Sequence, residues 1–356
     1  MGRPERLRLI QSIEAARDGN KLICLVTGDR RGLETKIAID ILPFLYEHLS
    51  TLGQMKSVDL FIYTAGGDSI AGWGLVNLVR EFCDKMNVII PFRALSCGTL
   101  IALGAHEILM SRGGQLSPVD PSVSSPYNPT APGQQGPGRI SLLPVSVEDM
   151  MAYLRMAGET GNPEQEDVVA GKAEKLITED NTANMINTLS NKVHPLALGA
   201  AYRAREQGAM LASRLMKYHE NDKEKIQNVV GLLTKALPTH NYLIGKKEAK
   251  GIIGLPIVDM DTDLEPLVWG LYKQYEDWFE LRKPYNAEAV LGSSQASTAG
   301  FPRAALESVD GTQLRSHVFT TTKELKRVQS TQPGIPIPIV GIQERIMAEE
   351  WVEDYS

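Results

Sequence analysis

Short apolar runs alternate with longer segments of helical periodicity in the first third of the chain. Residues 21–28 (KLICLVTG), 58–64 (VDLFIYT) and 87–92 (NVIIPF) are apolar runs of strand length. Residues 35–52 and 69–85 place apolar side chains three and four positions apart, which is the spacing of one helix face. Continuous apolar strands separated by helices are typical of a mostly parallel sheet flanked by helices. The pattern therefore predicts an α/β fold.

The regular alternation ends after residues 98–111, which have the pattern of a helix followed by a strand. Residues 122–139 are rich in Pro, Gly, Ser and Gln, so they predict an irregular loop. Helical spacing returns in residues 146–157, 194–219 and 223–237. We therefore expect a helical region after the loop.

The composition changes again beyond residue 260, where an aromatic helical segment precedes a tail rich in Ser, Thr and Pro. We expect a first domain over residues 1–260 and a C-terminal helical extension with a tail over residues 261–356. The helix expected over residues 266–279 carries aromatic side chains at helical spacing. They are Trp269, Tyr272, Tyr275, Trp278 and Phe279. Such a stripe fits either a contact between subunits or packing onto its own subunit.

Composition and charge narrow the class of protein. The 356 residues are 43% hydrophobic and 22% charged, which is enough for a sizeable core. A net charge of −6 argues against general binding to nucleic acid. The three cysteines, Cys24, Cys83 and Cys97, are widely spaced in apolar runs, which is typical of reduced, buried thiols. No apolar run reaches the roughly 18 residues of a membrane helix. We therefore expect a cytoplasmic protein with no membrane span.

Small and polar residues follow two of the expected strands. Gly66 and Gly67 come directly after the second strand, and Ser96 comes after the third. In an open parallel sheet the carboxyl ends of neighbouring strands meet at one edge, so these residues should lie together. The backbone N–H groups of Gly67 and Cys97 can then stabilise an oxyanion beside the Ser96 hydroxyl. The alternative is that Ser96 only caps a helix and that the glycine pair only forms a turn.

Two segments carry a family resemblance, IYTAGGDSIAG and ALSCGTLIALGAHEILMSRGGQLSPVDPS. They resemble the Clp/crotonase-like serine peptidases, and most closely the serine dehydrogenase proteinases, relatives of signal peptide peptidase A and the Clp proteolytic subunit. The resemblance covers most of residues 20–260 and implies a Clp/crotonase-like fold of repeated ββα or βα units. It also implies an oxyanion loop at Gly66 and Gly67, and a nucleophile at Ser96. Assembly as a homo-oligomer is a further implication.

The general base is less clearly marked. The Clp subunit uses a histidine where this chain reads QLSPVDPS, so that triad is not reproduced. His194 precedes a proline at a helix start, and the ordinary pKa of histidine suits a general base. Lys192 is the second candidate, because signal peptide peptidase A, which this chain resembles more distantly, uses a lysine. His240 and Asp120 are secondary candidates.

The sequence thus predicts an ATP-independent serine endopeptidase that acts on peptides or proteins. Ser96 would form an acyl-enzyme that water hydrolyses. We expect no cofactor and no metal site, because no cluster of His, Cys and Asp has ligand spacing. The segment GDRRG lacks the Lys-Ser/Thr of a phosphate-binding loop, so no ATPase module is expected. The alternatives are an inactive Clp-like scaffold or peptide-binding module, and a crotonase-type acyl-CoA enzyme.

Overall fold

The chain forms two compact units in the computed structural model. The structure describes residues 2–119, 126–130, 143, 184, 187–237, 239, 241–330 and 339–354. The first unit combines Met1–Leu116 with Ile244–Ser356, and the second is Ser117–Leu243. The boundary expected near residue 260 therefore falls inside the first unit, because the C-terminal segment packs with the N-terminal one.

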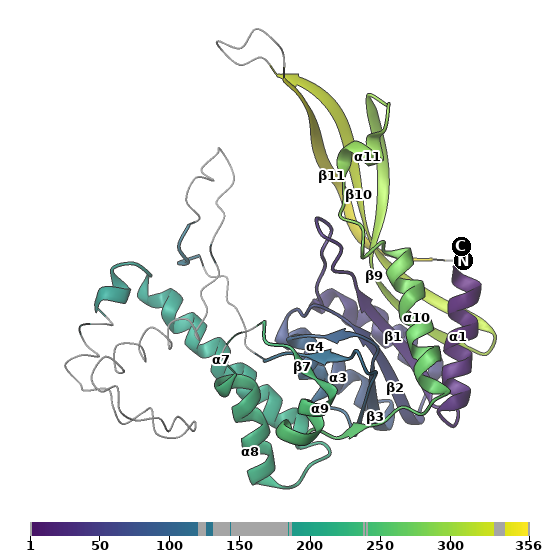
Figure 1. Cartoon of the computed structure of the whole chain (residues 1–356), viewed down its shortest axis with the longest axis vertical. Helices are drawn as coiled ribbons and strands as arrows, with labels where there is room; N and C mark the ends of the chain where they lie inside the picture. The colour runs from purple at the N-terminus through teal and green to yellow at the C-terminus, as the bar shows by residue number, and fades with distance from the viewer. Residues whose placement is uncertain are drawn as a thin grey trace. The chain divides into compact units, whose positions relative to one another are not determined.

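The first unit contains a large sheet, a small sheet and helices on both faces of the large sheet (Figure 1). Its elements are α1 (Arg3–Ala16), β1 (Lys21–Thr27), η1 (Ile39–Ile41), α2 (Leu42–Leu52), β2 (Met55–Tyr63), α3 (Ser69–Arg80), β3 (Cys83–Ile90), β4 (Arg93–Ala94), α4 (Cys97–Ala102), β5 (Glu107–Met110), β6 (Gln115–Leu116), β7 (Ile244–Gly245), α9 (Lys246–Glu248), η4 (Ala249–Ile253), β8 (Ile257–Val258), α10 (Leu264–Trp278), α11 (Ala287–Leu291), β9 (Ala296–Asp310), β10 (Gln313–Ser330) and β11 (Ile339–Glu353).

The described strands of the large sheet follow the order β11-β10-β9-β1-β2-β3-β5-β8. The pairs from β1 through β8 are parallel, with Cys24 opposite Phe61 and Phe61 opposite Ile89. These three side chains are fully buried, as expected for strands covered on both faces. The predicted α/β class, with a mostly parallel sheet flanked by helices, is confirmed. A small sheet of order β4-β6-β7 lies beside the point where β3 ends.

The helix expected over residues 35–52 begins later than its apolar spacing suggested. α2 starts at Leu42 and has Pro43 in its first turn, where a missing backbone N–H costs little. The preceding Ile37 is extended and forms a parallel bridge with Gly67. Pairing with the glycine loop is thus preferred to another helical turn. Apolar periodicity alone does not show this competition.

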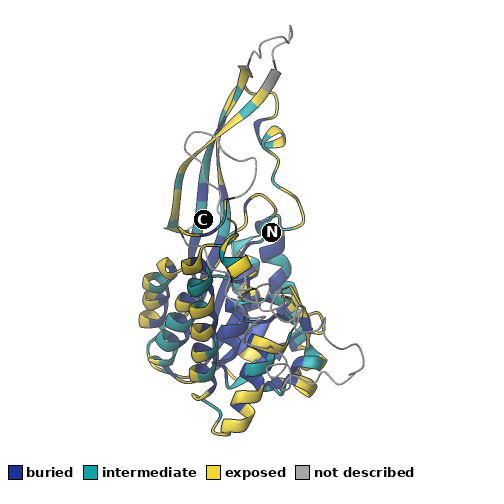
Figure 2. Ribbon diagram, turned by 90° about the vertical axis from the view of Figure 1, so that its left-hand side faces the viewer, coloured by how far each residue is buried: buried dark blue, intermediate teal, exposed yellow. Residues whose placement is uncertain are grey.

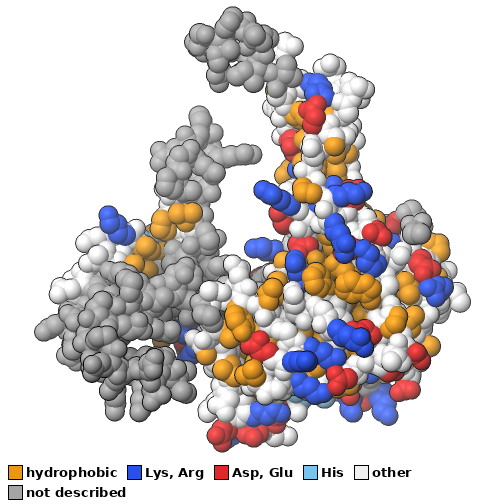
Figure 3. Space-filling view, in the orientation of Figure 1, with side chains coloured by type: hydrophobic (Ala, Val, Ile, Leu, Met, Phe, Trp, Pro, Cys, Tyr) orange, Lys and Arg blue, Asp and Glu red, His pale blue; other side chains and the backbone are white. Residues whose placement is uncertain are grey.

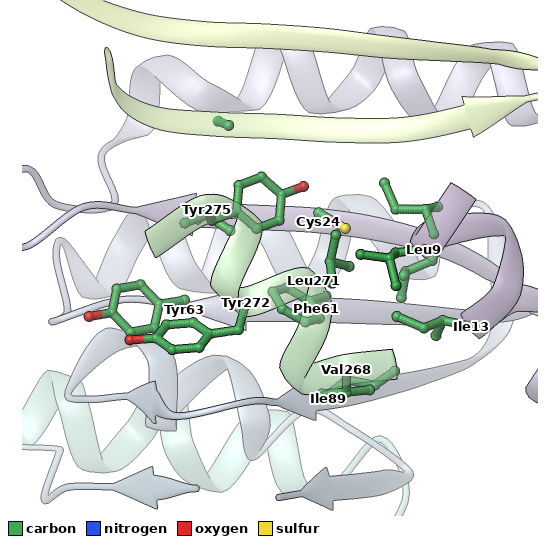
Figure 4. Close-up of a cluster of buried hydrophobic side chains, with 14 of the residues drawn as sticks. Leu9, Ile13, Cys24, Phe61, Tyr63, Ile89, Val268, Leu271, Tyr272 and Tyr275 are labelled. Atoms are coloured by element: carbon green, nitrogen blue, oxygen red, sulfur yellow. The ribbon is translucent and has the colours of Figure 1, made fainter. Parts of the chain in front are cut away.

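Two helices far apart in the sequence, α1 and α10, lie side by side on one face of the large sheet (Figure 1). Tyr272, Tyr275 and Phe279 of the expected aromatic stripe belong to this core and are at most 3% exposed. Figure 4 shows the Tyr272 ring beside the ring of the sheet residue Tyr63, and the Tyr275 ring lies 6.1 Å from that of Phe61 between centroids. The stripe therefore packs onto its own unit, and its use as a subunit contact is wrong for these three side chains.

The segment expected as a helical extension is helical only in part. α10 and α11 are present, but residues 296–330 and 339–353 form three antiparallel strands, and β9 pairs with β1. A two-residue turn joins β9 to β10, and its Gly311 has a φ of 58°. An Asp-Gly pair between strand-like runs favours a hairpin, so this signal was present in the sequence. Figure 2 shows the strand ends nearest the core as buried and the far ends as largely exposed.

The second unit is helical where the structure describes it. Its described elements are α7 (Pro195–Met216), α8 (Lys223–Gly231) and η3 (Leu232–Ala236). They confirm the helices expected over residues 194–219 and 223–237. Most of the expected loop over residues 122–139, and all of the helix over residues 146–157, lie outside the described residues.

Candidate active site

Ser96 occupies the turn between β4 and α4 and has a strained backbone. Its φ is 50° and its ψ is −108°, a conformation that a residue with a side chain rarely adopts. The turn is held on both sides, because Gly98 N–H donates to Leu95 O at 2.8 Å and Leu100 N–H donates to Ser96 O at 3.0 Å. Strain of this kind costs on the order of 1–3 kcal/mol and persists only where the surroundings impose it.

The glycine pair lies directly against this turn. A Cβ added to Gly66 would be 2.9 Å from the Cβ of Ser96 and 3.4 Å from its Oγ. A Cβ added to Gly67 would be 2.2 Å from the carbonyl oxygen of Ile37. Both positions therefore require glycine for steric reasons. The structure brings together the three residues that the strand-end argument placed together.

Two backbone donors at this site have no acceptor among the residues that the structure describes, the N–H groups of Gly67 and Cys97. The Gly67 N–H is left over because the bridge to Ile37 uses Gly66 O and Asp68 N. The Cys97 N–H belongs to the first turn of α4, whose donors lack partners within the helix. Such donors at a helix start can stabilise a developing negative charge.

The Cys97 side chain has a packing role. Its Sγ donates to Asp68 O at 3.2 Å, and a Cβ added to Gly72 would be only 2.6 Å from that sulfur. α3 and α4 therefore approach closely just beyond the two turns. Burial raises the pKa of the Cys97 thiol to about 12, so the thiol stays neutral. A buried, neutral thiol of this kind is not a nucleophile.

Two threonines that the sequence reasoning missed hold the glycine loop in place. Thr64 Oγ1 accepts from Gly66 N–H at 3.0 Å and donates to Gly66 O at 3.1 Å. It also accepts from the Thr27 hydroxyl at 2.7 Å, and all these groups are buried. Thr64 directly precedes the small residues of the loop. That position was the available signal, but it does not reveal Thr27 as its partner.

Of the four candidates for the general base, the structure describes His194 and Lys192. His194 is the N-cap of α7, and its Nδ1 accepts from Leu196 N–H at 3.2 Å. Its ring stacks on Tyr127 with a centroid distance of 4.7 Å. The geometry is that of a helix cap, and the role of base stays a prediction.

Lys192 is exposed in the turn before that helix, and its backbone N–H donates to Leu189 O. Asp120 and His240 lie outside the described residues. His194 and Lys192 belong to the second unit, whereas Ser96 belongs to the first. The base therefore remains a prediction for all four candidates.

A different serine and histidine are in contact in the first unit, but they are buried. His48 Nδ1 lies 2.6 Å from Ser308 Oγ, and His48 Nε2 lies 2.9 Å from His317 Nδ1. These three side chains are at most 3% exposed, so no substrate can reach them. This cluster joins α2 to β9 and β10 and has a structural role.

The described residues carry few features of other kinds of site. They contain no group of three His, Cys, Asp or Glu side chains arranged for a metal, and no helix of membrane-spanning length and hydrophobicity. The three cysteines are buried free thiols. On the face in Figure 3, Lys and Arg side chains are interspersed with Asp and Glu over the described surface.

The segment that contains Gly66, Gly67 and Ser96 is similar to a known protein family. Residues 45–131, about a quarter of the chain, match one family model. They match the ClpP-like SDH-type serine proteinases. The resemblance expected from the sequence is confirmed over this segment, which includes Gly66, Gly67 and Ser96. The match to this proteinase family supports a serine peptidase.

The chain is also similar to two curated proteins. Two uncharacterized proteins of Methanocaldococcus jannaschii are 33% and 27% identical over 127 and 221 residues, which are 33% and 62% of this chain. The matches cover 42% and 59% of those proteins, so the chain spans about half the length of the curated relatives it matches.

Two solved structures of the 1510-N membrane-bound stomatin-specific protease, a serine mutant and a lysine mutant bound to a substrate peptide, are 22% and 20% identical, with TM-scores of 0.24 and 0.25. They cover 41% and 45% of this chain, and 66% and 67% of their own chains. ClpP1 from Listeria monocytogenes is 12% identical with a TM-score of 0.33, over 72% of this chain and 97% of its own.

Proposed function

We propose that this chain hydrolyses peptide bonds through an acyl-enzyme on Ser96, with the Gly67 and Cys97 N–H groups as the oxyanion hole. One observation carries the proposal. A strained serine at a helix start lies against a glycine loop, and two backbone donors beside it have no acceptor among the described residues. Strained turns are retained at functional sites, where the strain fixes the direction of a reacting group. A serine that only capped α4 would accept a backbone N–H, and Ser96 makes no such side-chain cap.

The reaction follows from the groups at the site. Ser96 Oγ attacks the peptide carbonyl carbon while a base removes the hydroxyl proton. The carbonyl oxygen becomes an oxyanion and accepts from the two N–H groups. Collapse of this intermediate breaks the C–N bond, and the proton passes to the leaving amine. Water then attacks the ester in the same way and releases the acid. His194 and Lys192 are retained as candidates for the base.

An extended peptide with apolar side chains suits the surroundings of the glycine loop. Ile37 lies extended opposite Gly67, and its main-chain groups bond to Gly66 O and Asp68 N–H, so this region already accommodates an extended backbone. Ile39 and Ile70, a few residues from that pairing, are 58% and 39% exposed. Exposed apolar side chains beside a reactive group favour apolar ligand groups.

The experiment is labelling of the full chain with a fluorophosphonate, together with peptide turnover. The wild type and a Ser294→Ala control, changed at an exposed serine, should be labelled once per chain. Ser96→Ala should lose labelling and at least about 10³-fold in kcat, because the nucleophile is missing. Its circular dichroism spectrum should match that of the wild type. Retained turnover in Ser96→Ala, or an unlabelled wild type between about pH 6 and about pH 10, would refute the proposal.

A further inference from the structure

The segment GDRRG has no role in the chemistry described so far, yet its aspartate makes two strong contacts. Asp29 lies two residues beyond the end of β1. Its Oδ1 accepts from the Tyr63 hydroxyl at 2.7 Å, and its Oδ2 accepts from Arg93 Nη1 at 2.9 Å. One carboxylate thus joins the ends of three strands, β1, β2 and β4. These are the strand ends from which the candidate active site is built.

The first contact acts on the oxyanion loop. Tyr63 is the last residue of β2, and the next residue is Thr64, which holds Gly66 through two hydrogen bonds. Successive side chains of a strand point to opposite faces. Tyr63 is therefore fixed by Asp29 on the α10 face, while Thr64 is fixed by Thr27 on the other. The chain is held from both sides immediately before the glycine pair.

The second contact acts on the nucleophile. Arg93 is the first residue of β4, three positions before Ser96. Its carbonyl oxygen accepts from Thr64 N–H at 2.9 Å, and Leu95 N–H donates to Thr64 O at 3.1 Å. Asp29 therefore holds the side chain of Arg93, and the backbone of Arg93 pairs with Thr64 in the segment that leads to Ser96. A shift of Asp29 would displace Thr64 and Arg93 together.

The contacts of Asp29 lie at an accessible cavity. A pocket of about 370 Å³ is lined by Asp29, Tyr63 and Arg93 together with side chains of α10 and the turn after it. The Asp29 and Arg93 side chains are 18% and 38% exposed. Figure 4 shows the Tyr63 hydroxyl at the same end of the core as that of Tyr272. Because water reaches these groups, we expect the ion pair to contribute little to the free energy of unfolding.

We infer that Asp29 is a positioning residue, which sets the distance between the Gly66–Gly67 loop and Ser96 through Tyr63 and Arg93. The inference rests on the proposed function. Its physical basis is the tight fit at the site, where the Cβ position of Gly66 is 2.9 Å from the Cβ of Ser96. At such separations a displacement well below 1 Å changes the alignment of the oxyanion donors with the attacking hydroxyl. Asp29 itself touches no reacting atom.

The test compares Asp29→Asn and Asp29→Glu with the wild type in the full chain. Asp29→Asn removes the charge that holds Arg93, so kcat and the rate of fluorophosphonate labelling should fall about ten-fold, with KM within about two-fold. Asp29→Glu keeps the charge and should recover part of the loss. Amide hydrogen exchange of Gly66 and Leu95, whose N–H groups bond to Thr64, should become at least about three-fold faster in Asp29→Asn.

Glu280→Gln is the matched control. It breaks another ion pair of the same loop, between Arg30 Nη2 and Glu280 Oε2 at 2.7 Å, and neither of these residues lies in β4 or next to it in the sequence. This variant should keep the wild-type kcat, labelling rate and exchange. An Asp29→Asn variant with unchanged kcat, or an equal loss in Glu280→Gln, would overturn the inference. An unlabelled and inactive wild type would instead refute the proposed function. The exchange of Gly66 and Leu95 would still show whether Asp29 holds the two turns.

Discussion

Glu307 is fully buried in β9 and connects the N-terminal and C-terminal parts of the first unit. Its carboxylate accepts from Arg6 Nε and Nη2, each at 2.9 Å. It also accepts from the Tyr275 hydroxyl at 2.6 Å and from Ser316 Oγ at 2.8 Å. Four elements, α1, α10, β9 and β10, thus meet at one side chain. We predict that Glu307→Ala strongly destabilises the first unit.

The magnitude follows from what the substitution leaves behind. Arg6 is 3% exposed, and removing the partner of a buried charge costs about 3–5 kcal/mol. The Tyr275 and Ser316 hydroxyls lose their acceptor, which adds about 1 kcal/mol or more for each. The Trp278 ring lies 3.9 Å from the Arg6 guanidinium in the wild type, and the substitution removes neither group, so this contact does not change the difference. We expect a loss of about 5–7 kcal/mol, a large part of the stability of an ordinary domain.

The assay is urea unfolding followed by tryptophan fluorescence. All four tryptophans lie in the first unit, so the signal reports that unit. The double variant Arg6→Met with Glu307→Leu removes both charges and should regain most of the lost free energy, because an apolar pair needs no compensation. A loss below about 1 kcal/mol in Glu307→Ala, or a double variant no better than the single one, would refute this reasoning.

Two further predictions concern the same unit. Burial, with smaller effects of His317 and Arg315, lowers the pKa of His48 to about 3, whereas an unfolded histidine titrates near about 6.5. The unfolded state therefore binds the extra proton, and stability should fall by up to about 1.4 kcal/mol per pH unit as the pH drops from about 6.5 towards 3. His48→Asn should show a shallower slope, and an equal slope would contradict the assignment. Truncation after residue 262 removes α10 and β9, so the remaining chain should show no cooperative thermal transition. A folded truncated chain would show that this core is dispensable.

The sequence predicted which residues of the site lie at the ends of neighbouring strands. The apolar runs identified β1, β2 and β3, and the parallel arrangement brought Gly66 and Ser96 to one edge. The strain at Ser96 and the Asp29 contacts were not predictable. They depend on atoms that come together only when several loops are in place. The general base was not predictable for the same reason, because a lone His194 or Lys192 has no local signature.

The pairing of the C-terminal strands could not be predicted from the sequence. Residues 296–353 carry an Asp-Gly hairpin signal, but their pairing with β1 joins positions about 280 residues apart. No local pattern indicates such a partner, and the Ser- and Thr-rich composition by itself predicts a tail. The packing partner of the aromatic helix α10 could not be predicted either. Its spacing predicted the helix correctly, whereas its buried neighbour α1 could not be inferred.

The sequence by itself determined the elements that short-range physics controls. These are the apolar strands, the helices around them, and the glycines required where no side chain fits. The tertiary structure decided which surfaces are covered and which polar groups meet. It brought α10 against α1, extended the sheet beyond β1, and placed one carboxylate, Asp29, at the ends of three strands. Helical and strand periodicity depend on neighbours a few residues apart. Pairing between distant segments depends on the whole chain, because only the complete packing sets the distances over which hydrogen bonds and ion pairs form.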